Sequence, residues 1–112
     1  LFAYSDYARA TYELMKSKGD VSLADECANA YSRILNVAPS GQEIWWRAKY
    51  YLFASLYEKG VYDEAAIGLK QLKRQNPRFD GGKYNLQAKF EALETKLDSK
   101  STGKGSGKNT KK

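Results

Sequence analysis

The chain has 112 residues, of which 42% are hydrophobic and 29% are charged, a balance that supports one packed domain and excludes a wholly disordered chain. It contains no histidine, which excludes Ser–His and Cys–His nucleophilic sites and histidine-ligated metals. The net charge is +6, but residues 99–112 hold five lysines and no acidic residue, so the remaining 98 residues carry only +1.

Five segments place apolar residues three and four positions apart, and this spacing predicts five helices and no sheet. In chain order they cover residues 2–18, 23–37, 41–59, 62–75 and 83–98. Gly19 and Gly60 follow the first and third segments, where a glycine can end a helix in the left-handed conformation. Pro39 and Pro77 close the second and fourth segments, because the residue before a proline resists helical geometry. We therefore expect an all-α fold.

Two of these helices begin with a serine followed three residues later by an acidic residue. The pairs are Ser22 with Asp25 and Ser40 with Glu43. In a capping pair of this spacing, the two side chains accept hydrogen bonds from free backbone N–H groups at the helix start. We expect both pairs to cap their helices.

The two ends of the chain differ from its middle. After residue 98 only Ser, Thr, Gly, Lys and Asn remain, and these residues cannot build a core, so we expect a folded domain over residues 1–98 and a disordered basic tail over residues 99–112. The chain begins at Leu1 rather than Met, from which we expect a fragment of a longer protein. No apolar run approaches the ~20 residues of a membrane span, and a cytoplasmic location is favoured.

The helices also repeat as pairs, since Gly19 and Gly60 are 41 residues apart and Pro39 and Pro77 are 38 apart. Residues 48–77 resemble the tetratricopeptide repeat family. The matching residues are Ala48, Leu52 and Leu56, the turn Gly60-Val61-Tyr62-Asp63-Glu64-Ala65, then Leu69, Leu72 and Pro77. The sequence departs from the family at Phe53, where a small residue is common, and at Cys27, where an alanine is usual.

This resemblance covers residues 1–77 as two repeats, and residues 83–98 are similar to the helix that ends such arrays. It implies a right-handed solenoid of antiparallel helix pairs. It also implies a concave groove lined by the first helix of each pair, with protein or peptide ligands.

Beside the apolar stripes of the first and third helices runs a second line of residues, which the resemblance places on the groove. The expected partner-binding residues are Asp6, Arg9, Glu13, Arg47, Tyr50, Ala54 and Tyr57. Tyrosine and arginine are among the residue types that most often dominate binding energy at interfaces. The tetratricopeptide subclass that clamps a terminal carboxylate uses an asparagine on these helices, and residues 2–18 and 41–59 contain none, so we do not expect that subclass.

The sequence therefore predicts a non-catalytic scaffold that binds a protein or peptide, with no enzyme activity, cofactor or metal. The single cysteine, Cys27, lies in an apolar stripe and is expected to be a buried, inert thiol. One alternative is association with RNA or an anionic surface through the tail and a basic cluster on and just after the fourth helix. That cluster consists of Lys70, Lys73, Arg74 and Arg78. The other alternative is a purely structural spacer whose groove binds nothing.

Overall fold

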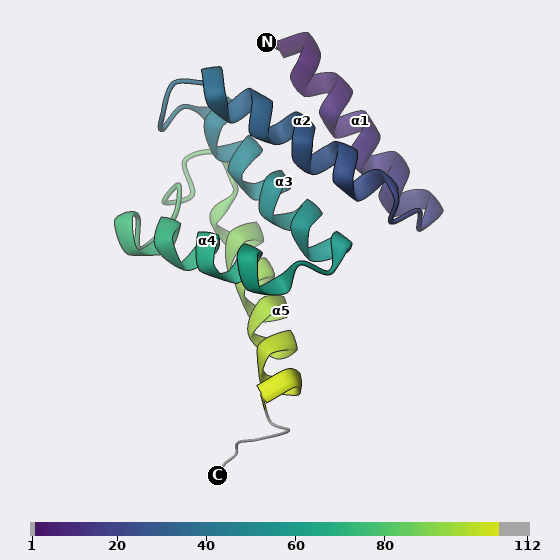
Figure 1. The fold of residues 1–112 in the computed structure, drawn as a ribbon. Coiled ribbons are helices and arrows are strands. Elements are labelled where there is room, and N and C mark those ends of the chain that lie inside the picture. Colours follow the sequence, from purple (N-terminus) through teal and green to yellow (C-terminus); the bar gives the residue numbers. More distant parts are fainter. Residues whose placement is uncertain (1, 106–112) are drawn as a thin grey trace.

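The structure, a computed structural model, describes residues 2–105, with side chains for residues 3–100. It contains five α-helices and, in the described range, no strand, which confirms the predicted all-α class. Figure 1 shows α1 (Phe2–Lys18), α2 (Leu23–Val37), α3 (Glu43–Lys59), α4 (Tyr62–Gln75) and α5 (Gln87–Gly105). No described helix combines the length and the apolar content that crossing a bilayer requires.

The first three helices lie side by side in alternating directions, and α4 and α5 pack against the far side of α3 (Figure 1). The chain reverses after α1 at Gly19, with φ of +64°, and after α3 at Gly60, with φ of +89°. The N–H of Gly60 donates to the carbonyls of Leu56 and Tyr57 and so closes the last turn of α3. Both glycines hold the left-handed conformation predicted for them, which residues with a Cβ adopt at a cost.

Two apolar clusters share α3, which is why this helix is the centre of the fold. The first cluster joins α1, α2 and α3 and contains Ala8, Ala30, Tyr31, Ile34, Ala38, Ile44 and Ala48. The second joins α3, α4 and α5, and its larger members are Trp46, Phe53, Leu56, Leu69, Leu72, Phe79, Leu86, Phe90, Leu93 and Leu97. Each fully buried side chain of this size stabilises the fold by roughly 1.5–3 kcal/mol.

The close packing of α3 on α4 depends on a glycine. A Cβ added to Gly68 would lie 2.6 Å from Cε1 and 3.0 Å from Cζ of Phe53, so a residue with a side chain would force this ring or the helix to shift. Phe53 is 6% exposed and belongs to the second cluster. The large residue at position 53, unusual for the resembled family, is thus accommodated by a missing side chain on the facing helix.

The connection between α4 and α5 is an ordered loop built around Asp80. Its carboxylate accepts hydrogen bonds from the backbone N–H groups of Gly82, Tyr84 and Leu86, at 3.0, 2.8 and 3.1 Å. Phe79 is buried and stacks on Phe90, with ring centroids 4.7 Å apart. Because Asp80 draws the backbone of residues 82–86 into this loop, the fifth helix begins at residue 87 rather than at the predicted residue 83.

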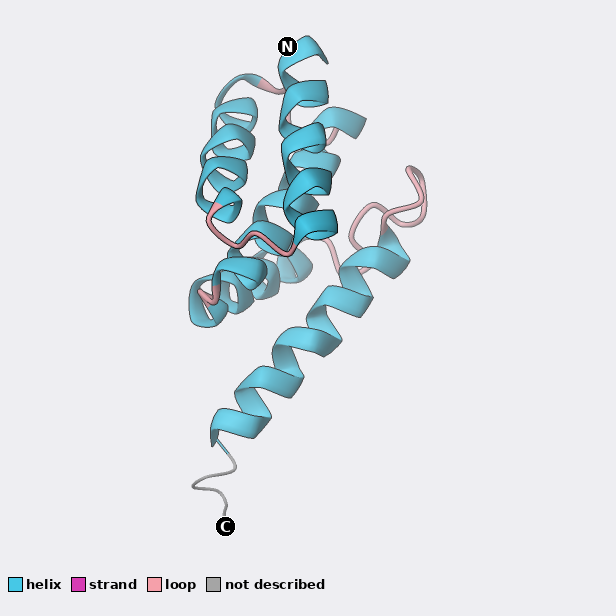
Figure 2. Ribbon diagram, turned by 90° about the vertical axis from the view of Figure 1, so that its right-hand side faces the viewer, coloured by secondary structure: helices cyan, strands magenta, loops and turns pink. Residues whose placement is uncertain are grey.

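The fifth helix also continues beyond its predicted end. It runs through residue 98, which was the expected domain boundary, to Gly105, and the rest of the expected tail, residues 106–112, lies outside the described residues. Figure 2 shows the C-terminal turns of α5 projecting away from the other helices. Among the side chains that the structure describes, up to residue 100, Leu97 is the last one buried in the second cluster.

Neither predicted capping pair forms. Ser22 makes no side-chain cap to α2; its N–H and hydroxyl both donate to Asp20 Oδ1 instead. The third helix begins two residues later than predicted, at Glu43, because the chain first turns through Gly41 with φ of +86°. Ser40 is therefore too far from the first turn to cap it, and the Glu43 carboxylate pairs with Arg47.

Candidate partner-binding face

A hollow between α1 and α3 brings together three of the predicted partner-binding residues. Its volume is about 250 Å³, and its lining is Ser5, Asp6, Arg9, Glu43, Ile44 and Arg47. The helices α1 and α3 both pack against α2 and touch each other. Arg9 and Arg47, which are 38 positions apart in the sequence, therefore share one surface. Asp6, Arg9 and Arg47 thus lie on one face, as the predicted groove requires.

The two arginines of this hollow are paired with carboxylates of their own helices. Arg9 Nε lies 3.6 Å from Glu13 Oε2, and both side chains are more than half exposed. Arg47 Nη2 lies 2.8 Å from Glu43 Oε2. Exposed pairs of this kind contribute about 0–1 kcal/mol. Each arginine can therefore exchange its intrahelical carboxylate for one supplied by a ligand at little cost.

The other predicted residues on α3 are covered rather than open. Ala54 is 3% exposed and so is not available to a ligand. The ring of Tyr50 is half-buried and packs edge-on against Phe90 and Tyr51, with centroids 5.6 and 5.1 Å apart. Tyr57 is also half-buried. The reason is that α4 and α5 both pack against α3, and Phe90 of α5 lies against Trp46 and Tyr50.

Two lysines of α5 complete the cover over these tyrosines. Lys89 Nζ lies 6.0 Å from the centroid of the Tyr50 ring, and Lys96 Nζ lies 5.8 Å from that of Tyr57. The ring of Tyr57 also packs edge-on against Tyr62, at 5.4 Å. The exposed groups on this part of the face are therefore ammonium ions, and sequence reasoning missed them because no pattern in the chain places α5 against α3.

A further tyrosine, Tyr12 on α1, also belongs to this region and was not predicted. Its ring packs edge-on against Tyr51 at 5.0 Å. Burial raises the pKa of Tyr12 well above its usual range, with smaller contributions from Tyr50 and Glu58, and burial likewise raises the pKa of Tyr50. Both hydroxyls are therefore neutral at physiological pH and can act as hydrogen-bond donors or acceptors.

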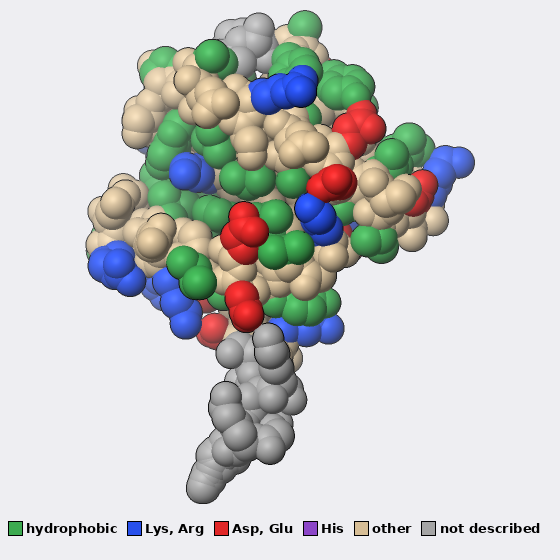
Figure 3. Space-filling view, viewed as in Figure 1, with side chains coloured by type: hydrophobic (Ala, Val, Ile, Leu, Met, Phe, Trp, Pro, Cys, Tyr) green, Lys and Arg blue, Asp and Glu red, His purple; other side chains and the backbone are tan. Residues whose placement is uncertain are grey.

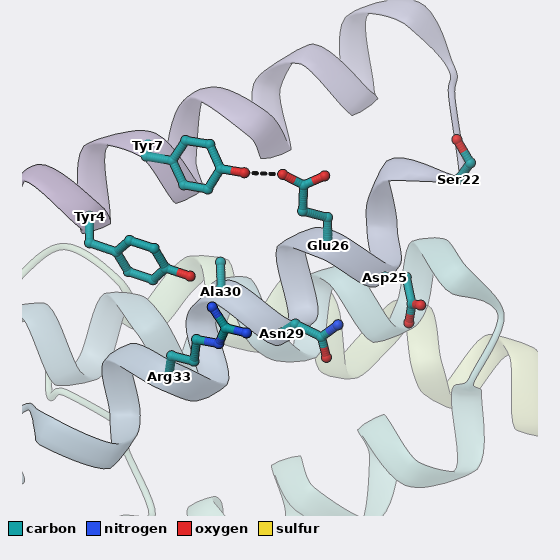
Figure 4. Close-up of a pocket in the computed structure, with 8 residues that line it drawn as sticks. All are labelled: Tyr4, Tyr7, Ser22, Asp25, Glu26, Asn29, Ala30 and Arg33. Atoms are coloured by element: carbon teal, nitrogen blue, oxygen red, sulfur yellow. Dashed lines mark hydrogen bonds between the residues drawn. The ribbon is translucent and has the colours of Figure 1, made fainter.

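A second, more open hollow of about 370 Å³ lies between α1 and α2 (Figure 4). The rings of Tyr4 and Tyr7 line one side, 5.7 Å apart, and Tyr7 donates its hydroxyl to the Glu26 carboxylate. This hydrogen bond is the main cause of the raised pKa of Tyr7. Arg33 and Asn29 come from α2. None of these residues was among the predicted partner-binding residues, because Tyr4 and Tyr7 are spaced as part of an apolar helix face.

The basic cluster predicted on the fourth helix is partly neutralised by α5. Lys73 Nζ lies 3.0 Å from Glu94 Oε2, so this pair links the two helices. Lys70, Arg74 and Arg78 are exposed. Figure 3 shows Lys and Arg side chains at the C-terminal end of α4, where Lys73 and Arg74 form the last turn. There their positive charges interact favourably with the negative end of the dipole of α4, and this interaction explains their position without a ligand.

The single cysteine thiol of the chain lies inside the fold. Cys27 is fully buried, as predicted, and burial raises the pKa of its thiol, which keeps it protonated at neutral pH. Within the described range, no three side chains of cysteine, aspartate or glutamate are grouped so that they could hold a metal ion.

No family model, curated protein or solved structure matches this chain.

Proposed function

We propose that the chain is a tetratricopeptide-like module that binds a protein or peptide, without catalysis, on the face formed by α1, α3 and α5. The single observation that carries this proposal is the hollow between α1 and α3, which joins Asp6 and Arg9 with Arg47 from the next helix pair. A spacer that binds nothing has no need for such a convergence of exposed charges.

The order of the helix contacts supports the solenoid part of the proposal. Each helix packs on the next one along the chain, and in addition α1 contacts α3 and α3 contacts α5. Among the described residues, α2 and α4 make no such contact. In a curved stack of helix pairs, the first helices of successive pairs touch and the second helices lie farther apart. The helices α1, α3 and α5 then line the concave side.

The size and chemistry of the hollow favour a partner side chain over a small metabolite. Pockets that enclose drug-sized ligands measure ≈300–1,000 Å³ and are mostly apolar. The hollow measures about 250 Å³ and presents two arginines and two acidic residues around Ile44. It has room for one or two side chains of a partner, and its charges of both signs can select for a matching pattern.

Site-specific crosslinking tests this proposal. A photoreactive amino acid is placed at Ser5 beside the hollow, or at Arg74 on the exposed side of α4 as a control. We expect partner crosslinks from position 5 only, and Arg47→Glu should abolish them while the helical circular dichroism spectrum stays unchanged. Crosslinks that form equally from position 74, or that survive Arg47→Glu, would contradict the proposed binding face.

A further inference from the structure

Three lysines follow one side of α5, each held over a tyrosine ring of another helix. Lys89 lies over Tyr50 and Lys96 over Tyr57, both on α3, and Lys100 Nζ lies 5.4 Å from the ring centroid of Tyr62 on α4. Positions seven and four residues apart fall on the same side of a helix. With a rise of 1.5 Å per residue, the three lysines span about 16 Å, and we call them the lysine row.

Two members of the lysine row, Lys89 and Lys96, have no carboxylate partner: among the described residues neither ammonium group forms an ion pair. Lys100 forms none with a described residue either, but it lines a small hollow together with Asp63 and Asp98, so carboxylates lie near it. Glu94 pairs with Lys73 of α4, and Glu91 accepts a hydrogen bond from Gln87 of its own helix. All three lysines are exposed, so each ammonium group keeps donors available to a ligand.

We infer that the lysine row binds an acidic segment of the protein partner, a conclusion that names the partner's chemistry and rests on the proposed function. Charge complementarity identifies this occupant, because Lys89 and Lys96 are exposed cations on one side of α5 without an ion pair, and they select carboxylates spaced along a chain. The tyrosine rings add preorganisation. A cation held over an aromatic ring at an exposed site gains about 0.5–1 kcal/mol, which reduces the freedom that each lysine must lose on binding.

The state of the tyrosine rings favours an acidic polypeptide over a single-stranded nucleic acid. Proteins that bind single strands stack the bases on open aromatic faces. Here the half-buried ring of Tyr50 packs against Phe90 and Tyr51 with Lys89 over it, and the half-buried ring of Tyr57 packs against Tyr62 with Lys96 over it. These contacts leave little of either ring open for a base to stack on, so charge is what the lysine row offers a ligand.

Fluorescence anisotropy with the full chain tests this inference. The probe is a labelled 12-residue peptide of alternating Glu and Ala, and the matched peptide carries Gln in place of Glu. We expect binding of the Glu peptide only, and an increase in Kd of at least about tenfold, or about 1.4 kcal/mol, for the Lys89→Glu/Lys96→Glu variant. The control variant Lys18→Glu/Arg33→Glu makes the same change in net charge on α1 and α2, which make no contact with α5 among the described residues, and should bind within about twofold of wild type. Circular dichroism should show both variants folded, since all four side chains are largely exposed.

Three results would overturn the inference. They are no binding of the Glu peptide, an equal loss of affinity in the control variant, and tighter, lysine-row-dependent binding of a labelled dT12 oligonucleotide. If the Glu peptide fails to bind while crosslinks from position 5 persist, only the acidic character of the partner is wrong. If the peptide binds while those crosslinks are absent, the proposed face between α1 and α3 is wrong and the lysine row stands alone.

Discussion

The substitution Gly68→Ala tests the packing of α3 on α4, because two effects of opposite sign act on it. Helix propensity alone predicts a gain of about 0.8–1.0 kcal/mol when alanine replaces glycine inside a helix. The structure predicts a loss. The new Cβ would lie 2.6 Å from Cε1 of Phe53, about 1 Å closer than the 3.5–4.0 Å at which carbon atoms normally meet.

Forcing an extra carbon into a packed core costs typically 1–3 kcal/mol. After the propensity gain of about 1 kcal/mol is subtracted, we expect Gly68→Ala to lower the free energy of unfolding by about 1 kcal/mol. Urea denaturation followed by circular dichroism measures this change as a lower midpoint with an unchanged slope. A midpoint that rises, by the amount helix propensity predicts, would refute the close approach of the two helices.

A second variant makes the cause specific. Phe53→Leu removes the ring atoms that the new Cβ would meet, so Gly68→Ala should be neutral or stabilising in that background. The two substitutions should therefore be coupled by about 0.5–3 kcal/mol, the range typical of residues in contact. Additive effects would show that the loss in Gly68→Ala has another origin.

Three more substitutions or conditions test other parts of the fold. Ala65→Leu should lower the free energy of unfolding by about 1–3 kcal/mol in urea melts, because Ala65 has no exposed surface, and a neutral result would mean that the helix register there is wrong. Asp80→Ala removes the acceptor of three backbone N–H groups and should cost about 1–2 kcal/mol, with faster hydrogen exchange over residues 82–86; unchanged exchange would contradict the role of this carboxylate. Burial raises the pKa of Tyr12, Tyr31 and Tyr50, so the folded state keeps neutral phenols that the unfolded chain ionises at about 10. Stability should therefore be fully present below pH ~10 and fall as the pH rises further, with tyrosinate absorbance at 295 nm appearing together with unfolding, and a urea midpoint that is flat to pH 11 would contradict the burial.

Local features of the sequence were enough to predict most of the helices. The spacing of apolar residues predicted α1, α2 and α4 with their observed bounds, and Gly60 predicted the left-handed end of α3. These features depend on residues only a few positions apart in the chain, so they can be read from the sequence alone. The predictions failed where the residues of a local pattern form other hydrogen bonds than the pattern implies. Ser22 bonds to Asp20 rather than to α2, and the loop around Asp80 uses residues that the pattern assigned to the fifth helix.

For the candidate binding face too, helical periodicity predicts some features and only the packing of the helices decides the others. That Asp6, Arg9 and Arg47 lie beside the apolar stripes follows from helical periodicity, and the structure places them together. The buried state of Ala54 follows from the packing of α4 and α5 on α3, and the half-buried rings of Tyr50 and Tyr57 and the lysine row follow from where α5 packs. No sequence pattern contains that information, because the position of α5 depends on contacts between residues about 40 positions apart. The sequence by itself determined which residues form helices and which helix faces are apolar; only the tertiary structure decided which polar surface stays open to a partner.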